Sequence, residues 1–231
     1  MRSVKKVKII GFPFAKSQIG IGAAATPSWL RSQHWFQNLQ RSHPLGIEFE
    51  QVDVKEINRF NLSNKPPISD MEPTEEKLNN DDIRLIVHNC ELLAKHVRKA
   101  LKEGYYPVIL GGDNCQTLGS AKAYKSIAPG TKTLWIDSMI DIDVESKKSP
   151  DFRALEVQTG FSDNCLNKID PDVELIINQQ KCMELSKDIA FVGVDWNNNQ
   201  EAINFLQNKG VNVIGNWMCQ PALVDELHSM I

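Results

Sequence analysis

Two short apolar segments that each end in an acidic turn constrain the fold of this chain most strongly. Residues 108–110 (Val-Ile-Leu) lead into the turn 111–114 (Gly-Gly-Asp-Asn), and residues 133–136 (Thr-Leu-Trp-Ile) lead into Asp137. About one helix of sequence separates them. Each segment is therefore expected to be a buried parallel strand whose last residues open into a crevice at the carboxyl edge of a sheet.

The rest of the chain continues this alternation of strands and helices. The expected strands are residues 7–10, 47–52, 107–110, 133–136, 189–194 and 211–214. The expected helices are residues 27–39, 82–102, 117–125, 201–209 and 221–230. Residues 58–80 are expected to form a surface loop, and residues 143–188 an irregular stretch. The alternation predicts one α/β domain, residues 1–231, built on a parallel, doubly wound sheet.

Charge and cysteine content argue against several functional classes. The net charge is -3 and no basic run marks a nucleic-acid-binding face. The five cysteines are odd in number and scattered, as is typical of reduced thiols in a cytosol-like compartment. No apolar run approaches the roughly 18–20 residues of a membrane span. The first eight residues are too short for a conventional transit peptide, so a cytoplasmic location is the default expectation. A mitochondrial one would need an internal signal in place of a cleavable presequence.

Three further candidate sites are weaker. Asp137, Asp141 and Asp143 could form an acidic pocket that takes one Mg²⁺ or Ca²⁺ through waters, although hydrogen-bonded strand-end carboxylates are the favoured interpretation. Cys115, at a helix start, could be a nucleophile, but no histidine lies near it in sequence to act as its base. The glycine pair at residues 20–22 lacks the rest of a dinucleotide fingerprint.

Four segments together match the pattern of one known family. They are residues 9–18 (IIGFPFAKSQ), 108–120 (VILGGDNCQTLGS), 134–143 (LWIDSMIDID) and 189–195 (IAFVGVD). They resemble the arginase and agmatinase (ureohydrolase) family, and the resemblance covers essentially the whole chain. It implies a three-layer α/β/α fold with a mostly parallel arginase-like sheet, shortened here to about six strands.

The resemblance also implies a binuclear manganese site, which the family builds from two histidines and four aspartates. The two histidine positions are occupied here by Asn114 and Met139. An amide is a weak ligand, and a thioether is too soft for manganese. Asp137 and Asp141 match two of the family's aspartates, whereas its Asp-x-Asp strand would lie beyond Ile231. These four positions are therefore expected to be vestigial, with no catalytic, cofactor-binding or metal-binding residue and no cofactor.

Two further family features are altered. The loop that supplies a catalytic histidine in the family aligns loosely with residues 149–153, where the histidine position is Arg153, which cannot shuttle protons at neutral pH. The family strand order is 2-1-3-8-7-4-5-6, so the strands expected to be missing are central. Either the sheet closes up as 2-1-3-4-5-6, or another polypeptide fills or covers the gap.

We interpret the chain as a catalytically inactive arginase-like protein that acts as a structural or interaction subunit of a larger protein assembly. Its expected partners are other protein subunits, with a homo-oligomer left open, and neither nucleic acid nor a membrane span is expected. One alternative is a ureohydrolase-type metal hydrolase of guanidino compounds, with residual activity or completed by a partner chain. Another is a guanidino small-molecule sensor, in which Asp143 would occupy the position of a substrate-contacting asparagine.

Overall fold

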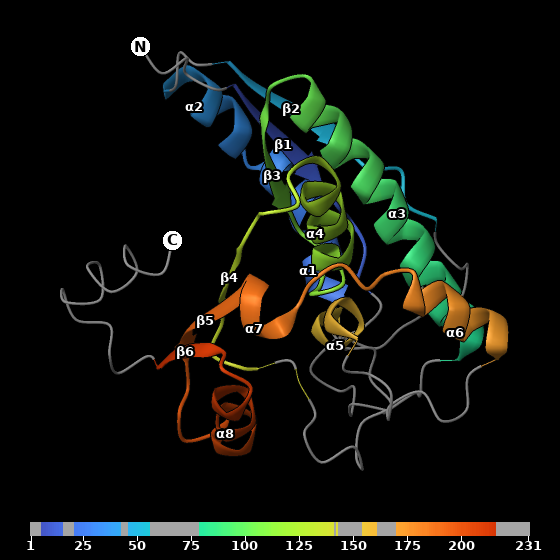
Figure 1. Ribbon diagram of the computed structural model, residues 1–231. Coiled ribbons are helices and arrows are strands. Elements are labelled where there is room, and N and C mark those ends of the chain that lie inside the picture. Colours follow the sequence, from blue (N-terminus) through green and yellow to red (C-terminus); the bar gives the residue numbers. More distant parts are fainter. Residues whose placement is uncertain are drawn as a thin grey trace, which may run out of the picture.

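Strands and helices alternate along the chain in the computed structural model (Figure 1). The structure describes residues 6–15, 21–42, 46–55, 79–140, 142, 154–160 and 170–215. The strands are β1 (Val7–Gly11), β2 (Ile47–Gln51), β3 (Tyr106–Leu110), β4 (Thr133–Ile136), β5 (Ile189–Val194) and β6 (Asn212–Gly215). The helices are α1 (Ile21–Ser32), α2 (Trp35–Ser42), α3 (Asn80–Lys102), α4 (Gln116–Ile127), α5 (Ala154–Thr159), α6 (Pro171–Asn178), α7 (Leu185–Asp188) and α8 (Gln200–Asn208). No helix within these described ranges is long and apolar enough to cross a membrane.

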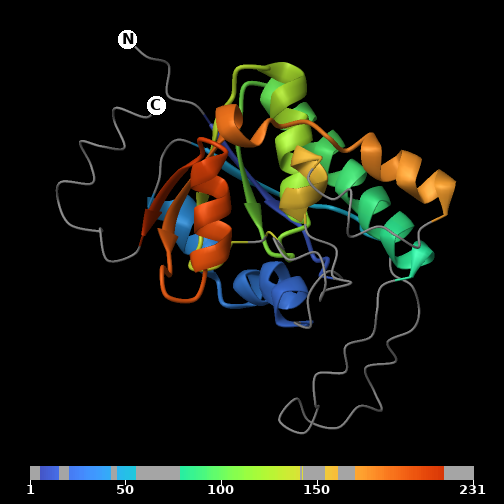
Figure 2. The same ribbon diagram turned by 60° about the horizontal axis from the view of Figure 1, so that its bottom comes forward.

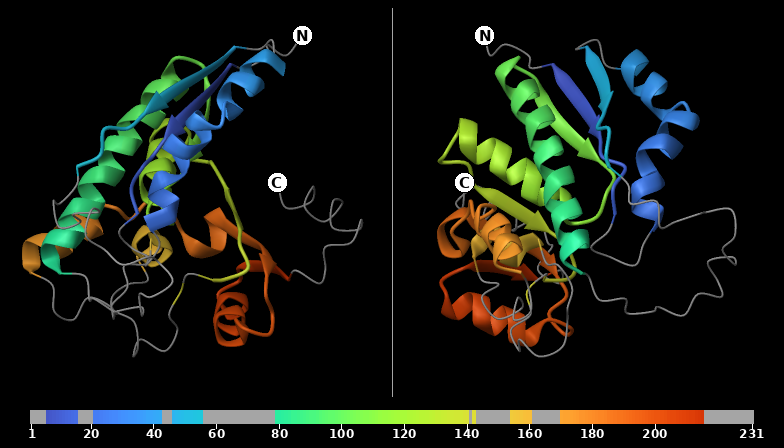
Figure 3. Two further views of the ribbon diagram at one scale, coloured as in Figure 1. Left: turned by 180° about the vertical axis from the view of Figure 1, so that it is seen from behind. Right: turned by 90° about the vertical axis from the view of Figure 1, so that its right-hand side faces the viewer.

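The six strands form two three-stranded sheets. Sheet A has the order β2-β1-β3 and sheet B the order β4-β5-β6. Every strand pair in both sheets is parallel, which confirms the predicted α/β class. The two sheets lie side by side with β3 and β4 facing each other (Figures 2 and 3), but β3 and β4 do not pair. The closed order 2-1-3-4-5-6 is therefore not formed.

Helices cover both faces of sheet A, as a doubly wound sheet requires. The helices α3 and α4 lie on one face and α1 and α2 on the other (Figure 3). Pro27 of α1 is so close to the sheet that a Cβ on Gly11 would lie 3.0 Å from the Pro27 Cβ. On the opposite face, α3 is the longest helix described, and its buried side includes Ile86, Leu93 and Val97. The amphipathic pattern predicted for residues 82–102 is therefore confirmed.

Several expected elements have other bounds. The predicted helix 27–39 is two helices, because His34 adopts a left-handed φ of +57° that an α-helix cannot continue through. The predicted irregular stretch 143–188 contains α5, α6 and α7. The start of α6 carries a sequence signal, since Asp170 precedes a proline at the first helical position. The expected terminal helix 221–230 lies outside the described residues.

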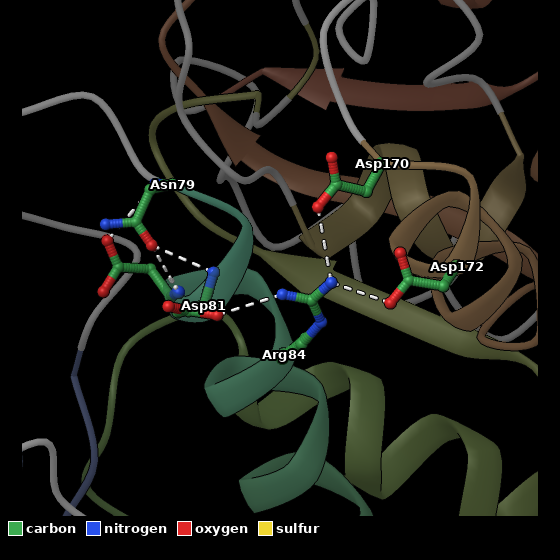
Figure 4. A network of polar contacts seen from close by, with 6 residues as sticks. Asn79, Asp81, Arg84, Asp170 and Asp172 are labelled. Carbon is green, nitrogen blue, oxygen red and sulfur yellow. Dashed lines mark hydrogen bonds and ion pairs between the residues drawn. The ribbon is translucent and has the colours of Figure 1, made fainter.

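The start of α3 is fixed by a capping box and an ion-pair network (Figure 4). The Asn79 side chain accepts hydrogen bonds from the main-chain N–H groups of Asp81 and Asp82, at 2.9 and 3.0 Å, and Asp82 accepts one from Asn79 N. Arg84 then reaches Asp172 at 2.7 Å and Asp170 at 3.4 Å, which ties α3 to the start of α6. Arg84 and the two aspartates are exposed, so these ion pairs orient α6 and contribute little to the free energy of unfolding.

A nearly buried lysine links β1 to β2 and to the end of α3. Lys8 of β1 is 6% exposed, and its Nζ lies 3.1 Å from Glu103, 3.5 Å from Glu48 and 3.8 Å from Glu50. Its Nζ also lies 4.3 Å from the centre of the Tyr105 ring. Burial alone would lower the pKa of Lys8, but the hydrogen bond and charge of Glu103 and the two other carboxylates raise it. The lysine therefore stays charged inside a strand that is otherwise apolar.

Helix α5 joins the hydrophobic clusters of the two sheets. Ala154 and Val157 belong to the cluster beneath sheet A, whereas Leu155 belongs to the cluster around sheet B. Gln158 is fully buried, and its side chain donates to Thr117 Oγ1 of α4 at 2.8 Å. Because β3 and β4 share no hydrogen bond, this short helix forms a direct connection between the two halves.

Asp188 at the end of α7 should make part of the stability depend on pH. It accepts hydrogen bonds from Lys125 Nζ at 2.6 Å and from Glu184 N at 2.8 Å. Burial would raise the pKa of Asp188, but these two bonds outweigh it, so the pKa lies below its ordinary value. The stabilisation is therefore complete above the unfolded-state pKa and is lost as the pH falls through the folded-state pKa.

We expect Asp188→Asn to lower the free energy of unfolding by roughly 1–2 kcal/mol at neutral pH, and by progressively less as the pH falls below the unfolded-state pKa and through the lowered folded-state pKa. Denaturant titrations of both proteins across this range would measure the difference. Glu174→Gln, on the exposed side of α6, is the control and should change stability at neutral pH by less than about 0.5 kcal/mol. A difference for Asp188→Asn that stays constant with pH would contradict the assignment.

Candidate functional site

The turn after β3 packs tightly against the end of β1. Gly111 and Gly112 both have a φ of +81°, which favours glycine. A Cβ on Gly112 would lie 2.8 Å from the Phe14 main-chain oxygen, so the second glycine is also required by space. Asp113, 5% exposed, donates its main-chain N–H to that same oxygen at 3.2 Å. The Gly-Gly-Asp sequence thus has a packing role in this chain.

The polar groups after this turn serve the start of α4. Asp113 Oδ1 accepts a hydrogen bond from Cys115 N at 3.0 Å. The main-chain oxygen of Asn114 accepts from Thr117 N at 3.1 Å and from Thr117 Oγ1 at 2.7 Å. These bonds satisfy main-chain groups at the helix start that would otherwise lack partners. Asn114, the first position expected to be vestigial, is half-buried within this arrangement.

The loops after β4 and β5 are joined by one side chain, Asn199. It is 6% exposed, and its Nδ2 donates to Ser138 O at 3.1 Å and to Asp195 O at 2.7 Å. Its Oδ1 accepts from Ile140 N at 2.9 Å. The sequence analysis did not identify this residue. Its contact with residues about 60 positions earlier has no local sequence signal.

The other predicted positions lie around this junction. Asp137 Oδ1 accepts from Met139 N at 3.2 Å, and Asp137 N donates to Val192 O at 3.1 Å. The Met139 side chain is 55% exposed. Beside Asp137, Gly193 has a φ of +84° and lies at an irregularity in the pairing of β5 with β6. Asp141, Asp143 and Arg153 lie outside the described residues.

The donor set of the described residues does not fit a pair of manganese ions. An amide at 114 and an exposed thioether at 139 are poor ligands for a hard cation. One carboxylate oxygen of Asp137 accepts a hydrogen bond from the loop that follows it. Among the residues that the structure describes, no group of three or more histidine, cysteine, aspartate or glutamate side chains could hold a metal ion.

The cysteine hypothesis gains no support from the geometry. Cys115 is fully buried, and its main-chain oxygen accepts a contact from Cys90 Sγ at 3.1 Å. Burial, with the nearby charge of Asp113, raises the pKa of the Cys90 thiol well above its usual range. Buried, protonated thiols are poor nucleophiles.

A cavity of about 330 Å³ lies away from the candidate positions. Its walls come from the end of α5 and from α7 and α8, with Met183, Leu185 and Phe205 as apolar lining and Glu184 and Lys209 as charged lining. None of Asn114, Asp137 and Met139 lines it. This cavity therefore does not extend the strand-end site.

Comparisons with known proteins place these features in context. The family model described as Arginase family matches residues 5–231. Arginase-1 of Oryctolagus cuniculus is 26% identical over 139 residues, which are 60% of this chain and 39% of the relative. Arginase of Bacillus subtilis is 27% identical over 143 residues, which are 60% of this chain and 42% of the relative. These matches span about two fifths of the length of the relatives.

Solved structures with this fold are longer than the chain. Arginase from Bacillus caldovelox superposes with a TM-score of 0.70 at 19% identity, covering 98% of this chain and 71% of that one. Formimidoylglutamase from Bacillus subtilis superposes with a TM-score of 0.56 at 17% identity, covering 99% of this chain and 62% of that one. At these identities the likeness concerns the fold alone, and it confirms the predicted architecture.

Proposed function

Because the chain belongs to the arginase family, we propose that it is a catalytically inactive member, which acts as a structural or interaction subunit of a larger protein assembly. The observation that carries this proposal is the pair Asn114 and Met139, which stand where the resemblance places the two histidine ligands. With an amide and a thioether there, two dications are not held close together, so no bridging water becomes a hydroxide at neutral pH.

The strand-end groups serve the fold in this proposal. Asn199 uses both ends of its amide to hold the loops after β4 and β5, and Asp113 and Asn114 secure the start of α4. Polar groups engaged in this way are not free to bind a substrate or to move a proton. The proposal assigns Asp137 and Asp141 to the same vestigial set.

A second candidate is a metal hydrolase of guanidino compounds that a partner chain completes. The names of the relatives favour it, since they are arginases. In this candidate the partner would have to supply ligands that replace both histidines. We therefore rank it below the structural role.

The test uses both the full chain and the assembly in which it occurs, purified under native conditions. We expect native mass spectrometry to find the chain in fixed stoichiometry with unrelated subunits. Incubated with Mn²⁺, the chain should retain no metal above the blank by elemental analysis, and it should release no urea from arginine or agmatine. The arginase of Bacillus subtilis is the positive control for both measurements.

A double variant, Asn114→His with Met139→His, tests whether these are the lost ligand positions. Two imidazoles at these positions should raise manganese retention above that of the unmodified chain. Urea release by the unmodified chain or its assembly, abolished by Asp137→Asn, would overturn the proposal in favour of the hydrolase. A free monomer without subunits in fixed stoichiometry would overturn the structural role.

A further inference from the structure

The outer side of the second half of α3 carries four basic residues. Lys95, Arg98, Lys99 and Lys102 recur at helical spacing, within an arc of about 100° and about 10 Å of helix length. The three lysines are exposed and Arg98 is half-buried. Together with Glu103 the four residues line a hollow of about 400 Å³. We call these four residues the α3 basic stripe.

The α3 basic stripe lies far from the strand-end positions. Helix α3 ends at Lys102, shortly before β3 begins at Tyr106. The stripe therefore lies toward the amino-terminal end of β3, whereas Asp113 and Asn114 follow its carboxyl end (Figure 1). The stripe is thus separate from the positions at which the resemblance places a metal site.

The acidic residues that flank the stripe in sequence have other cationic partners. Glu103 lies 3.1 Å from the Nζ of Lys8. Glu91, one turn before Lys95, forms an ion pair with Lys122 of α4. No ion pair joins a member of the stripe to a carboxylate of the described residues. The four positive charges are therefore not neutralised within this part of the chain.

Helix stability accounts for only half of the stripe. Cations in the last turn compensate the partial negative charge at the helix C-terminus, which explains Lys99 and Lys102. The other two members lie before that turn. They add like charges at spacings of three and four residues, an arrangement that destabilises a helix. At the start of α3, by contrast, Arg84 is paired with Asp81. The stripe therefore reduces local stability, as a set of residues that binds an anion would.

The charge of the stripe also acts on a neighbouring histidine. His88 is half-buried and lies two turns before Lys95, on the same side of α3. Burial lowers the pKa of His88, and the charges of Lys55 and Lys95 lower it further. The charges that shift this pKa are both positive, so the surface at this end of the stripe also favours an anion.

We propose that the α3 basic stripe binds the phosphate groups of a small polyphosphate ligand. Arg98 can donate two parallel hydrogen bonds to one phosphate, and the three lysines act as point charges around the hollow. Linked phosphates concentrate several negative charges within the roughly 10 Å of helix that the stripe spans. This binding is independent of the proposed function, because it needs neither a metal ion nor an assembly.

Two larger anions fit the stripe less well. A nucleic-acid backbone is usually bound by a basic domain, whereas this chain has a net charge of -3 and the stripe is confined to one helix. An acidic peptide spreads its carboxylates along a flexible chain that must be ordered on binding. Inorganic triphosphate has the required charge density without that ordering, and it is the probe for the test.

Isothermal titration calorimetry of the full chain with inorganic triphosphate tests the assignment. A salt concentration of about 150 mM screens unspecific attraction between exposed charges. We expect a single saturable site for triphosphate. Its affinity should be at least about tenfold higher than that for inorganic monophosphate, which engages fewer of the four cations.

Matched double variants separate the stripe from net charge. Lys95→Gln combined with Lys99→Gln should weaken triphosphate binding at least about tenfold. Lys132→Gln combined with Lys209→Gln removes the same charge from exposed lysines outside α3 and should change the affinity by less than about twofold. The stripe variant should melt no lower than the unmodified chain, because it relieves like-charge neighbours. Misfolding would then not explain its loss of binding.

The remaining outcomes would contradict the assignment. Absence of saturable binding, or equal losses in the two double variants, would overturn it. Tighter binding of RNA or of polyglutamate than of triphosphate in the same buffer would also overturn it, since the stripe would then serve a macromolecule. None of these results changes the proposed function, which is tested by stoichiometry, metal retention and urea release.

Discussion

Gly119→Val is expected to lower the free energy of unfolding by at least about 3 kcal/mol, the larger of the expected single-residue effects. Gly119 lies in α4 where that helix crosses α3. A Cβ there would collide with the main-chain oxygen of Cys90 and lie 3.1 Å from the Leu93 Cβ. The collision is with main chain, so no side-chain rotation relieves it, and the two helices would have to separate over a buried contact.

Urea titration monitored by circular dichroism would measure this loss. Gly130→Val is the matched control, because a Cβ at Gly130 meets no atom within 4 Å and should change stability by less than about 0.5 kcal/mol. Equal stabilities of the two variants would show that α3 and α4 are not packed as closely as described.

Asn199→Ala is expected to lower the free energy of unfolding by roughly 2–3 kcal/mol, because it removes three hydrogen bonds and takes away the side-chain partner of the buried Ile140 N and of Asp195 O. The third bond, to Ser138 O, is also lost, but that oxygen still accepts from Asp195 N at 2.8 Å. The loops after β4 and β5 lose the side chain that joins them and keep only the main-chain bond from Asp195 N to Ser138 O among the bonds described. We therefore also expect faster amide exchange at Ile140 before any effect on sheet A.

Asn198→Ala provides the control for this residue. Asn198 is the exposed neighbour, and its side chain contacts only Asp195 among the hydrogen bonds described. We expect a loss of less than about 1 kcal/mol for it. If both alanine variants have the same stability, Asn199 does not organise the junction.

Most of the strands were predictable because they carry a short apolar run that a polar turn ends, whereas β2 was predictable from its alternating residues. The residue pattern of β5 reflects burial along most of the strand, which local sequence records directly. The break between α1 and α2 was missed because it depends on a left-handed His34, a conformation with no strong sequence signal in a non-glycine residue. Helix α7 has four residues, too few to show a period of 3.6.

The candidate site, like the fold, could be predicted from the sequence only in part. The acidic turns after β3 and β4 could be located, since chain order and strand direction determine where strands end. The bonds that polar side chains make there could not be predicted from the sequence. Asp113 and Asp137 bond to nearby main chain, and Asn199 bonds to residues about 60 positions earlier. Sequence therefore indicates where polar groups gather, and packing decides which of them remain available.

The position of α5 affects how the molecule opens locally. A continuous sheet passes strain from strand to strand through its ladder, but here the ladder is interrupted. The two sheets are linked instead by the six-residue helix α5 with its buried glutamine and by the Lys125–Asp188 ion pair between α4 and α7. The two halves should then behave as separate cooperative units with unequal opening free energies. A ligand or partner that holds sheets A and B together at this interruption would merge the two units into one. Its binding would then change the cooperativity of unfolding more than the shape of the molecule.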